Sequence, residues 1–164
     1  MTELVINPFN RATITAAIKA VKAYKRWVIA KETALRLRLA SIGVEVARVA
    51  FAGAIYDGTN DVIVRLDDTG SVATVYAEGK SVAFIEFGSG AKFGGGHPMG
   101  AELGFFPGSW SLGEEGKGHW NDPNGWYYAH DKKSHGNPPA MAMIAARDEM
   151  EARFTAIARE VFSK

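Results

Sequence analysis

The stretch Phe84-Ile85-Glu86-Phe87-Gly88-Ser89-Gly90 divides this chain, because an apolar run with the alternation of a strand stops abruptly in glycines. The segment that follows, residues 91–136, holds all four histidines and three of the four tryptophans. Connections within a domain are usually only about 4–6 residues long, so an excursion of this size is typically functional or disordered. Its aromatic content argues against plain disorder.

The composition is that of one globular domain covering residues 1–164, with a formal net charge of +1. The charge is uneven, because residues 11–48 contain nine Lys or Arg and two Glu, which gives +7 by subtraction. The absence of cysteine excludes disulfides and thiolate metal sites. Neither a secretory signal nor a membrane-spanning stretch is expected.

Two amphipathic helices are predicted before the first strand. Asn10 caps the first helix, which is expected to bend or end near residues 24–27. The second helix carries one continuous apolar stripe at alternating spacings of four and three. The stripes are Ile14, Ile18 and Val21 in the first helix, and Leu35, Leu39, Ile42, Val46 and Val49 in the second.

From residue 61 the apolar period changes to two, which predicts strands. Turn residues at 67–70 and 78–80 separate three of them, and the third covers residues 82–87. A C-terminal helix is expected to open at Asn137-Pro138-Pro139-Ala140, with Asn137 as its cap. The predicted fold class is therefore α+β, in the order α-α-β-β-β-α, with a three-stranded antiparallel meander and a long Gly/aromatic loop before the last helix.

The candidate catalytic groups lack the spacing that chemistry requires. Three loop histidines, with His97 as a fourth, could bind zinc together with Asp122 or Asp131, but they match no metal motif. Carboxylates for glycoside hydrolysis would have to come from the same loop. Gly88-Ser89-Gly90 fits neither a phosphate loop nor a nucleophile elbow. The three loop histidines are His119, His130 and His135, and the glycosidase carboxylates would be drawn from Glu114, Glu115, Asp122 and Asp131. We therefore predict no catalytic residue, no metal and no cofactor.

Interaction residues are the better candidates. Glu86 either faces water on an edge strand or, if covered, needs a basic partner such as Arg65 or an arginine of another subunit. The loop aromatics either anchor a protein interface or fold back onto their own domain. They include Trp110, Trp120, Trp126, Tyr127 and Tyr128. The basic helices could also track the phosphates of DNA.

The motif at residues 84–90 resembles a "VEFGTG"-like strand end found in tail-component proteins of long-tailed bacteriophages. That family includes tail terminators, also called tail-completion or tail-to-head joining proteins. Several members continue with a Gly- and Trp-rich insertion and then a segment with Pro and Ala that opens a C-terminal helix, as Asn137-Pro138-Pro139-Ala140 does here. Ser89 stands where threonine is commoner in the family.

The resemblance implies a structural virion protein without enzymatic activity. Its subunits would form a homo-oligomeric ring, a hexamer matching the sixfold tail tube, that ends the tube and meets the head-tail connector protein. The expected location is the virion tail or head-tail junction, with DNA only as the passing genome. The proposed interaction residues are Glu86, Phe87, Gly88, Ser89, Gly90 and the loop aromatics named above. Two alternatives are another neck or connector protein that contacts DNA, and a metal-dependent hydrolase that uses the loop histidines.

Overall fold

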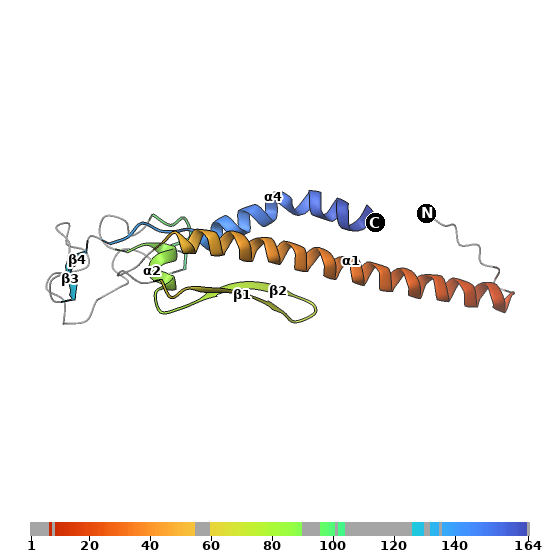
Figure 1. Ribbon diagram of the computed structural model, residues 1–164. Coiled ribbons are helices and arrows are strands. Elements are labelled where there is room, and N and C mark those ends of the chain that lie inside the picture. The colour runs from red at the N-terminus through yellow and green to blue at the C-terminus, as the bar shows by residue number, and fades with distance from the viewer. Residues whose placement is uncertain are drawn as a thin grey trace.

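The computed structural model describes residues 7, 9–54, 60–89, 96–100, 102–103, 126–129, 132–134 and 136–163. In chain order the elements are α1 (Arg11–Ala52), β1 (Ile63–Asp68), β2 (Ala73–Glu78), α2 (Val82–Phe87), β3 (Trp126–Ala129), β4 (Lys132–Ser134) and α4 (Ala142–Ser163). Figure 1 shows α4 along one side of α1 and the β1–β2 hairpin along the other.

The two predicted N-terminal helices are a single helix, α1, of 42 residues. The Asn10 side chain caps it by accepting a hydrogen bond from the Ala12 amide at 3.0 Å. No glycine or proline interrupts residues 11–42, and an apolar residue recurs at every seventh position of this stretch, so nothing bends the helix near residues 24–27. These apolar positions are Ile14, Val21, Val28, Leu35 and Ile42.

The predicted three-stranded meander is wrong, because residues 82–87 form helix α2 instead of a third strand. β1 and β2 pair only with each other in their sheet, with Val64 opposite Ala77 and Leu66 opposite Val75. Ile85 and Glu86 are both buried. Consecutive residues of a strand point to opposite faces, whereas one helical turn against the core can bury both.

Helix α4 runs antiparallel to α1. Three contacts in reverse order along the two helices establish this: Met150 lies beside Gly43, Glu160 pairs with Arg38, and the Phe162 ring contacts the Trp27 ring. A Cβ atom on Gly43 would lie 2.7 Å from Met150 Sδ, so the missing side chain is what lets the two helices approach there. The N-terminal part of α1 projects beyond the end of α4 (Figure 1), and the contact of Phe162 with Trp27 lies at that end of α4.

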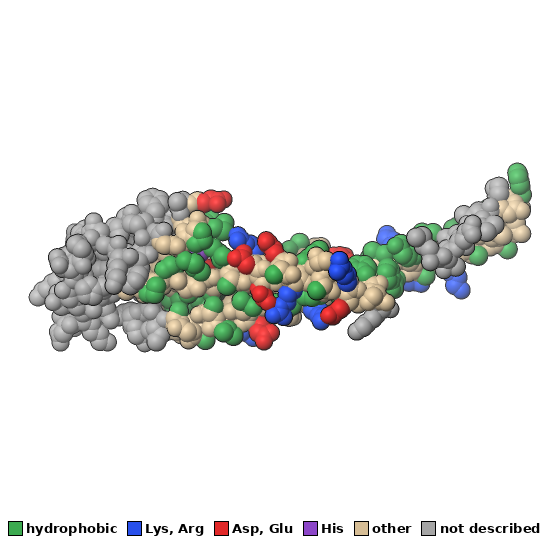
Figure 2. Space-filling view, turned by 90° about the horizontal axis from the view of Figure 1, so that it is seen from above, with side chains coloured by type: hydrophobic (Ala, Val, Ile, Leu, Met, Phe, Trp, Pro, Cys, Tyr) green, Lys and Arg blue, Asp and Glu red, His purple; other side chains and the backbone are tan. Residues whose placement is uncertain are grey.

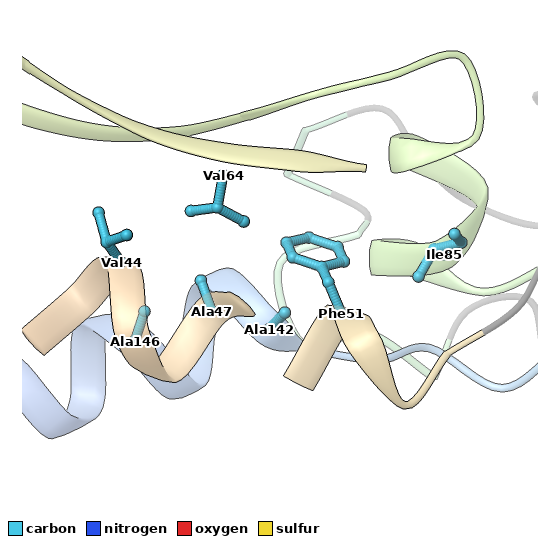
Figure 3. Close-up of a cluster of buried hydrophobic side chains, with 7 residues drawn as sticks. All are labelled: Val44, Ala47, Phe51, Val64, Ile85, Ala142 and Ala146. Atoms are coloured by element: carbon cyan, nitrogen blue, oxygen red, sulfur yellow. The ribbon is translucent and has the colours of Figure 1, made fainter. Parts of the chain in front are cut away.

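The hydrophobic core lies where the second half of α1 meets the other elements. Phe51 of α1 is the largest side chain in it, and it lies between Val64 of β1 and Ile85 of α2 (Figure 3). Val44, Ala47, Ala142 and Ala146 complete the buried cluster. The described helices include none that is both long and apolar enough to cross a membrane.

Candidate functional site

The carboxylate of Glu86 is buried and caps the N-terminus of α4. Its Oε2 accepts a hydrogen bond from the Ala142 amide at 2.8 Å, and its Oε1 accepts one from the Met143 amide at 3.1 Å. These amides belong to the first turn, whose N–H groups have no partner within the helix. A negative charge also interacts favourably with this end of the helix dipole. Glu86 therefore fixes where α4 begins and how it is tied to α2.

His97 is the second buried polar side chain of this site. Its Nδ1 accepts a hydrogen bond from the Met99 amide at 3.2 Å, which assigns the ring proton to Nε2. Nε2 lies 3.3 Å from Glu86 Oε1 and donates to it. The ring also lies 4.4 Å, centroid to centroid, from the ring of Phe87. Both ring nitrogens are thus occupied by protein groups.

Backbone contacts join the end of α2 to the chain just before α4. The Ala140 amide donates to the Ile85 carbonyl at 2.8 Å, and the Ser89 amide donates to the Asn137 carbonyl at 3.0 Å. Gly88 has φ of 75°, and a Cβ atom there would lie 2.8 Å from the nitrogen of Pro139. Only glycine fits a position with this backbone conformation and this crowding.

The prediction that Asn137 caps the last helix is wrong, since α4 begins at Ala142. The Asn137 side chain donates instead to the Phe84 carbonyl at 2.9 Å and accepts from the Ser89 hydroxyl at 2.5 Å. The two sequence motifs therefore contact each other directly. We call this site the Glu86 junction, and it consists of Glu86, Gly88, Ser89, His97, Asn137, Ala142 and Met143.

An apolar groove of about 480 Å³ opens beside the junction, between β2 and α4. Val75, Phe87, Met99 and Leu103 are among its apolar lining residues, and Glu86, His97 and Arg147 also line it. The described residues include no group of three or more His, Cys, Asp or Glu side chains that could hold a metal ion. The carboxylate of Glu86 and the imidazole of His97 hydrogen-bond to each other and to backbone amides.

The structure places some of the predicted interaction residues and not others. Glu86, Phe87, Gly88 and Ser89 all lie in or beside the Glu86 junction, and Glu86 is only 5% exposed. The backbone of β3 includes three of the predicted aromatics, Trp126, Tyr127 and Tyr128. Gly90, Trp110, Trp120 and the histidines and carboxylates of the zinc and glycosidase hypotheses, apart from His97, lie outside the described residues.

Glu86 is covered and does not face water, but Arg65, one of the basic partners suggested from the sequence, does not pair with it. Arg65 pairs with Glu78 across the hairpin at 2.5 Å instead. The groups that satisfy Glu86 are backbone amides 56 and 57 residues further along the chain, together with His97. A buried carboxylate needs hydrogen-bond donors. The predicted start of a helix after the motif was the one signal in the sequence for such donors, because the first amides of a helix have no partner within it.

The projecting part of α1, residues 11–26, is the second feature with functional potential. Four large hydrophobic side chains are exposed on it: Ile14, Ile18, Val21 and Tyr24. The same segment contains five Lys or Arg and no Asp or Glu. On the face shown in Figure 2, this end of the molecule accordingly displays hydrophobic and basic side chains side by side.

Comparison with known proteins finds no matching family model, no matching curated protein and no matching solved structure. The features of this chain that bear on its function are the Glu86 junction, the projecting part of α1 and the resemblance of residues 84–90 to the phage tail-component motif.

Proposed function

We propose that this protein is a structural virion subunit of a long-tailed bacteriophage, a tail terminator or tail-completion protein that forms a homo-oligomeric ring. The ring ends the tail tube and joins it to the head connector. In this proposal the protein is not an enzyme, and the chain acts through its surfaces.

The observation that carries the proposal is the projecting part of α1. Val21 is 57% exposed and Tyr24 is 66% exposed, on a helix segment that no other described element covers. A contiguous run of apolar side chains in water is costly, and such surfaces mark protein interaction sites. A small protein that keeps such a surface on a long extension is suited to assembly with neighbouring subunits.

The Glu86 junction supports the same proposal from another direction. The residues that carry the family resemblance, Glu86 and Gly88, hold α2 to the start of α4 through buried hydrogen bonds and a close backbone approach. Their chemistry is that of a framework, which suits a protein whose work is mechanical joining.

Deletion of the gene in the phage tests this function. We expect filled heads without joined tails, often together with tails of abnormal length, when lysates are examined by electron microscopy. Supplying the intact gene from a plasmid should restore virions and serves as the control. Normal virions from the deletion strain would contradict the proposal.

A second candidate is a neck or connector protein that contacts DNA, which the basic surface of residues 11–26 favours. Binding of duplex DNA by the purified protein, weakening steeply as salt rises, would support this candidate. The exposed apolar side chains of the same segment favour a protein partner instead.

A further inference from the structure

The outer face of the β1–β2 hairpin is also uncovered by described residues. Its inner face packs against α1 through Val64, which is buried, whereas Ile63 is 50% exposed and Tyr76 is 37% exposed. Isolated two-stranded hairpins are marginally stable and gain from packing against helices. The hairpin therefore offers a second surface on which a helix can pack.

The charges of the two uncovered surfaces are opposite. Residues 11–26 of α1 carry five cations and no carboxylate. The outer face of the hairpin, which alternates with buried Val64, carries the carboxylates of Asp67 and Glu78 and one cation, Arg65, which pairs with Glu78. Pairing the projecting segments of two copies with each other would bring five cations against five, and like charges in an interface are unfavourable. Complementary charge favours contact between the helix of one copy and the hairpin of another.

The dimensions of the two surfaces agree as well. Sixteen residues of helix, 11–26, extend about 24 Å, and the six-residue strands of the hairpin extend about 20 Å. A helix lying on a sheet of this length would cover most of it. The helix would then contact its own hairpin with its second half and a neighbour's hairpin with its first half.

We propose that residues 11–26 of α1 dock on the outer face of the β1–β2 hairpin of a second copy of this chain. Val21 and its apolar neighbours contact Ile63 and Tyr76, while Lys19 and Lys22 face Asp67 and Glu78 on the outer face of the hairpin. Such a contact joins two different patches, so repetition of it produces a closed ring or a filament. The inference rests on the proposed ring and deepens it by naming the two surfaces that meet.

Engineered cysteines test the contact directly, because the chain contains no cysteine of its own. One preparation carries Val21→Cys, a second carries Tyr76→Cys, and the two are mixed and treated with a short bifunctional maleimide. We expect cross-linked dimers to form at least about tenfold faster than in the control mixture of Val21→Cys with Arg159→Cys, an exposed position on α4. Thermal unfolding of each variant verifies that it is folded.

Charge exchange supplies a second, independent measurement on the same mixture. Adding Lys19→Glu and Lys22→Glu to the helix partner should lower cross-linking at least about fivefold. Adding Asp67→Lys and Glu78→Lys to the hairpin partner should then restore it. Restoration by the compensating change is not expected from a mere loss of folding.

Three results would overturn the inference. Cross-linking of Val21→Cys with itself at the same rate would indicate symmetric pairing of the helices. Equal rates in the test and control mixtures would indicate that the two surfaces do not meet. Binding of duplex DNA that Lys19→Glu and Lys22→Glu abolish, with cross-linking at the control level, would assign the helix to nucleic acid.

The gene deletion separates this inference from the proposed function. Specific cross-linking together with normal virions from the deletion strain would support the helix–hairpin contact and contradict the proposed phage function. Absence of specific cross-linking together with unjoined heads and tails would support the proposed function and contradict the helix–hairpin contact.

Discussion

At the scale of single residues, Glu86 holds the position of greatest consequence. Its carboxylate accepts hydrogen bonds from two amides of α4 and from His97, all inside the protein. Removing the carboxylate would leave these buried donors without an acceptor. The loss of stability from such unsatisfied groups is larger than the average net contribution of a hydrogen bond.

We expect Glu86→Ala to lower the free energy of unfolding by about 2–4 kcal/mol and Glu86→Gln to lower it by less, because the amide oxygen still accepts one hydrogen bond. Urea denaturation followed by circular dichroism measures both. Glu45→Gln removes the same charge from an exposed position on α1 and should change the stability by less than about 0.5 kcal/mol. Equal effects at positions 45 and 86 would contradict the capping role.

Gly88 and Gly70 provide a matched pair for backbone effects. Both have positive φ, 75° and 85°, but a Cβ atom on Gly88 meets Pro139 and Asn137 within 3 Å, while one on Gly70 meets nothing within 4 Å. Gly70→Ala should therefore cost about 1 kcal/mol from backbone conformation alone. Gly88→Ala should cost clearly more in the same denaturation experiment. Similar losses would show that the α2–α4 junction tolerates the extra atom.

The Asp61 carboxylate binds the backbone just before α2, and this contact makes the stability of the protein depend on pH. Hydrogen bonds from the Ser81 and Lys80 amides, which precede α2, hold the pKa of its carboxyl below the ordinary value. The unfolded chain then binds more protons than the folded chain in acid, so this stabilisation is present above about pH 4 and is lost as the pH falls through the lowered pKa.

We expect Asp61→Asn to lower the melting temperature at pH 7, and we expect its difference from the unmodified protein to shrink as the pH is lowered below about 4. Thermal scans across this pH range provide the measurement. Asp67→Asn removes a carboxylate from the same hairpin without touching the start of α2 and is the matched control. A difference for Asp61→Asn that stays constant at all pH values would contradict the assignment.

At the scale of elements, local pattern predicted the type of the first elements but not the continuity of α1, which was expected to bend or end near residues 24–27. The seven-residue recurrence of Val21, Val28 and Leu35 specifies helix, and the alternation around Val64 specifies the first hairpin. Residues 82–87 alternate like a strand, yet they form α2, in which the neighbouring residues Ile85 and Glu86 are both buried. Tertiary contacts overrode the local pattern there.

The start of α4 illustrates the same limit. Asn137 followed by prolines is a sound local signal for a helix start, but the cap that operates is Glu86, 56 residues before Ala142. A cap supplied from another element cannot be inferred from local spacing. Glu86, Gly88 and Ser89 of the junction are among the residues predicted for interaction, whereas His97 was considered for zinc and Asn137 as a helix cap, and the contacts that join them were not predicted.

At the scale of the whole molecule, the Glu86 junction changes what the long excursion contributes. Among the residues that the structure describes, the buried hydrophobic cluster contains none from residues 91–136. His97, however, belongs to the excursion and hydrogen-bonds to Glu86, while Met99 and Leu103 line the groove beside it. The first part of the excursion therefore supports the framework.

Two shortened proteins separate these contributions. Replacing residues 104–135 by a flexible Gly/Ser linker retains His97 and should leave cooperative unfolding and helical circular dichroism, because lengthening or shortening a loop changes closure entropy only slowly. Replacing residues 91–136 removes His97 as well and leaves the Oε1 side of Glu86 without its imidazole partner, so this protein should unfold at lower urea concentration, by about 1–3 kcal/mol in free energy. Equal stability of the two shortened proteins would contradict a supporting role for His97, and loss of folding in the first would show that residues 104–135 belong to the core.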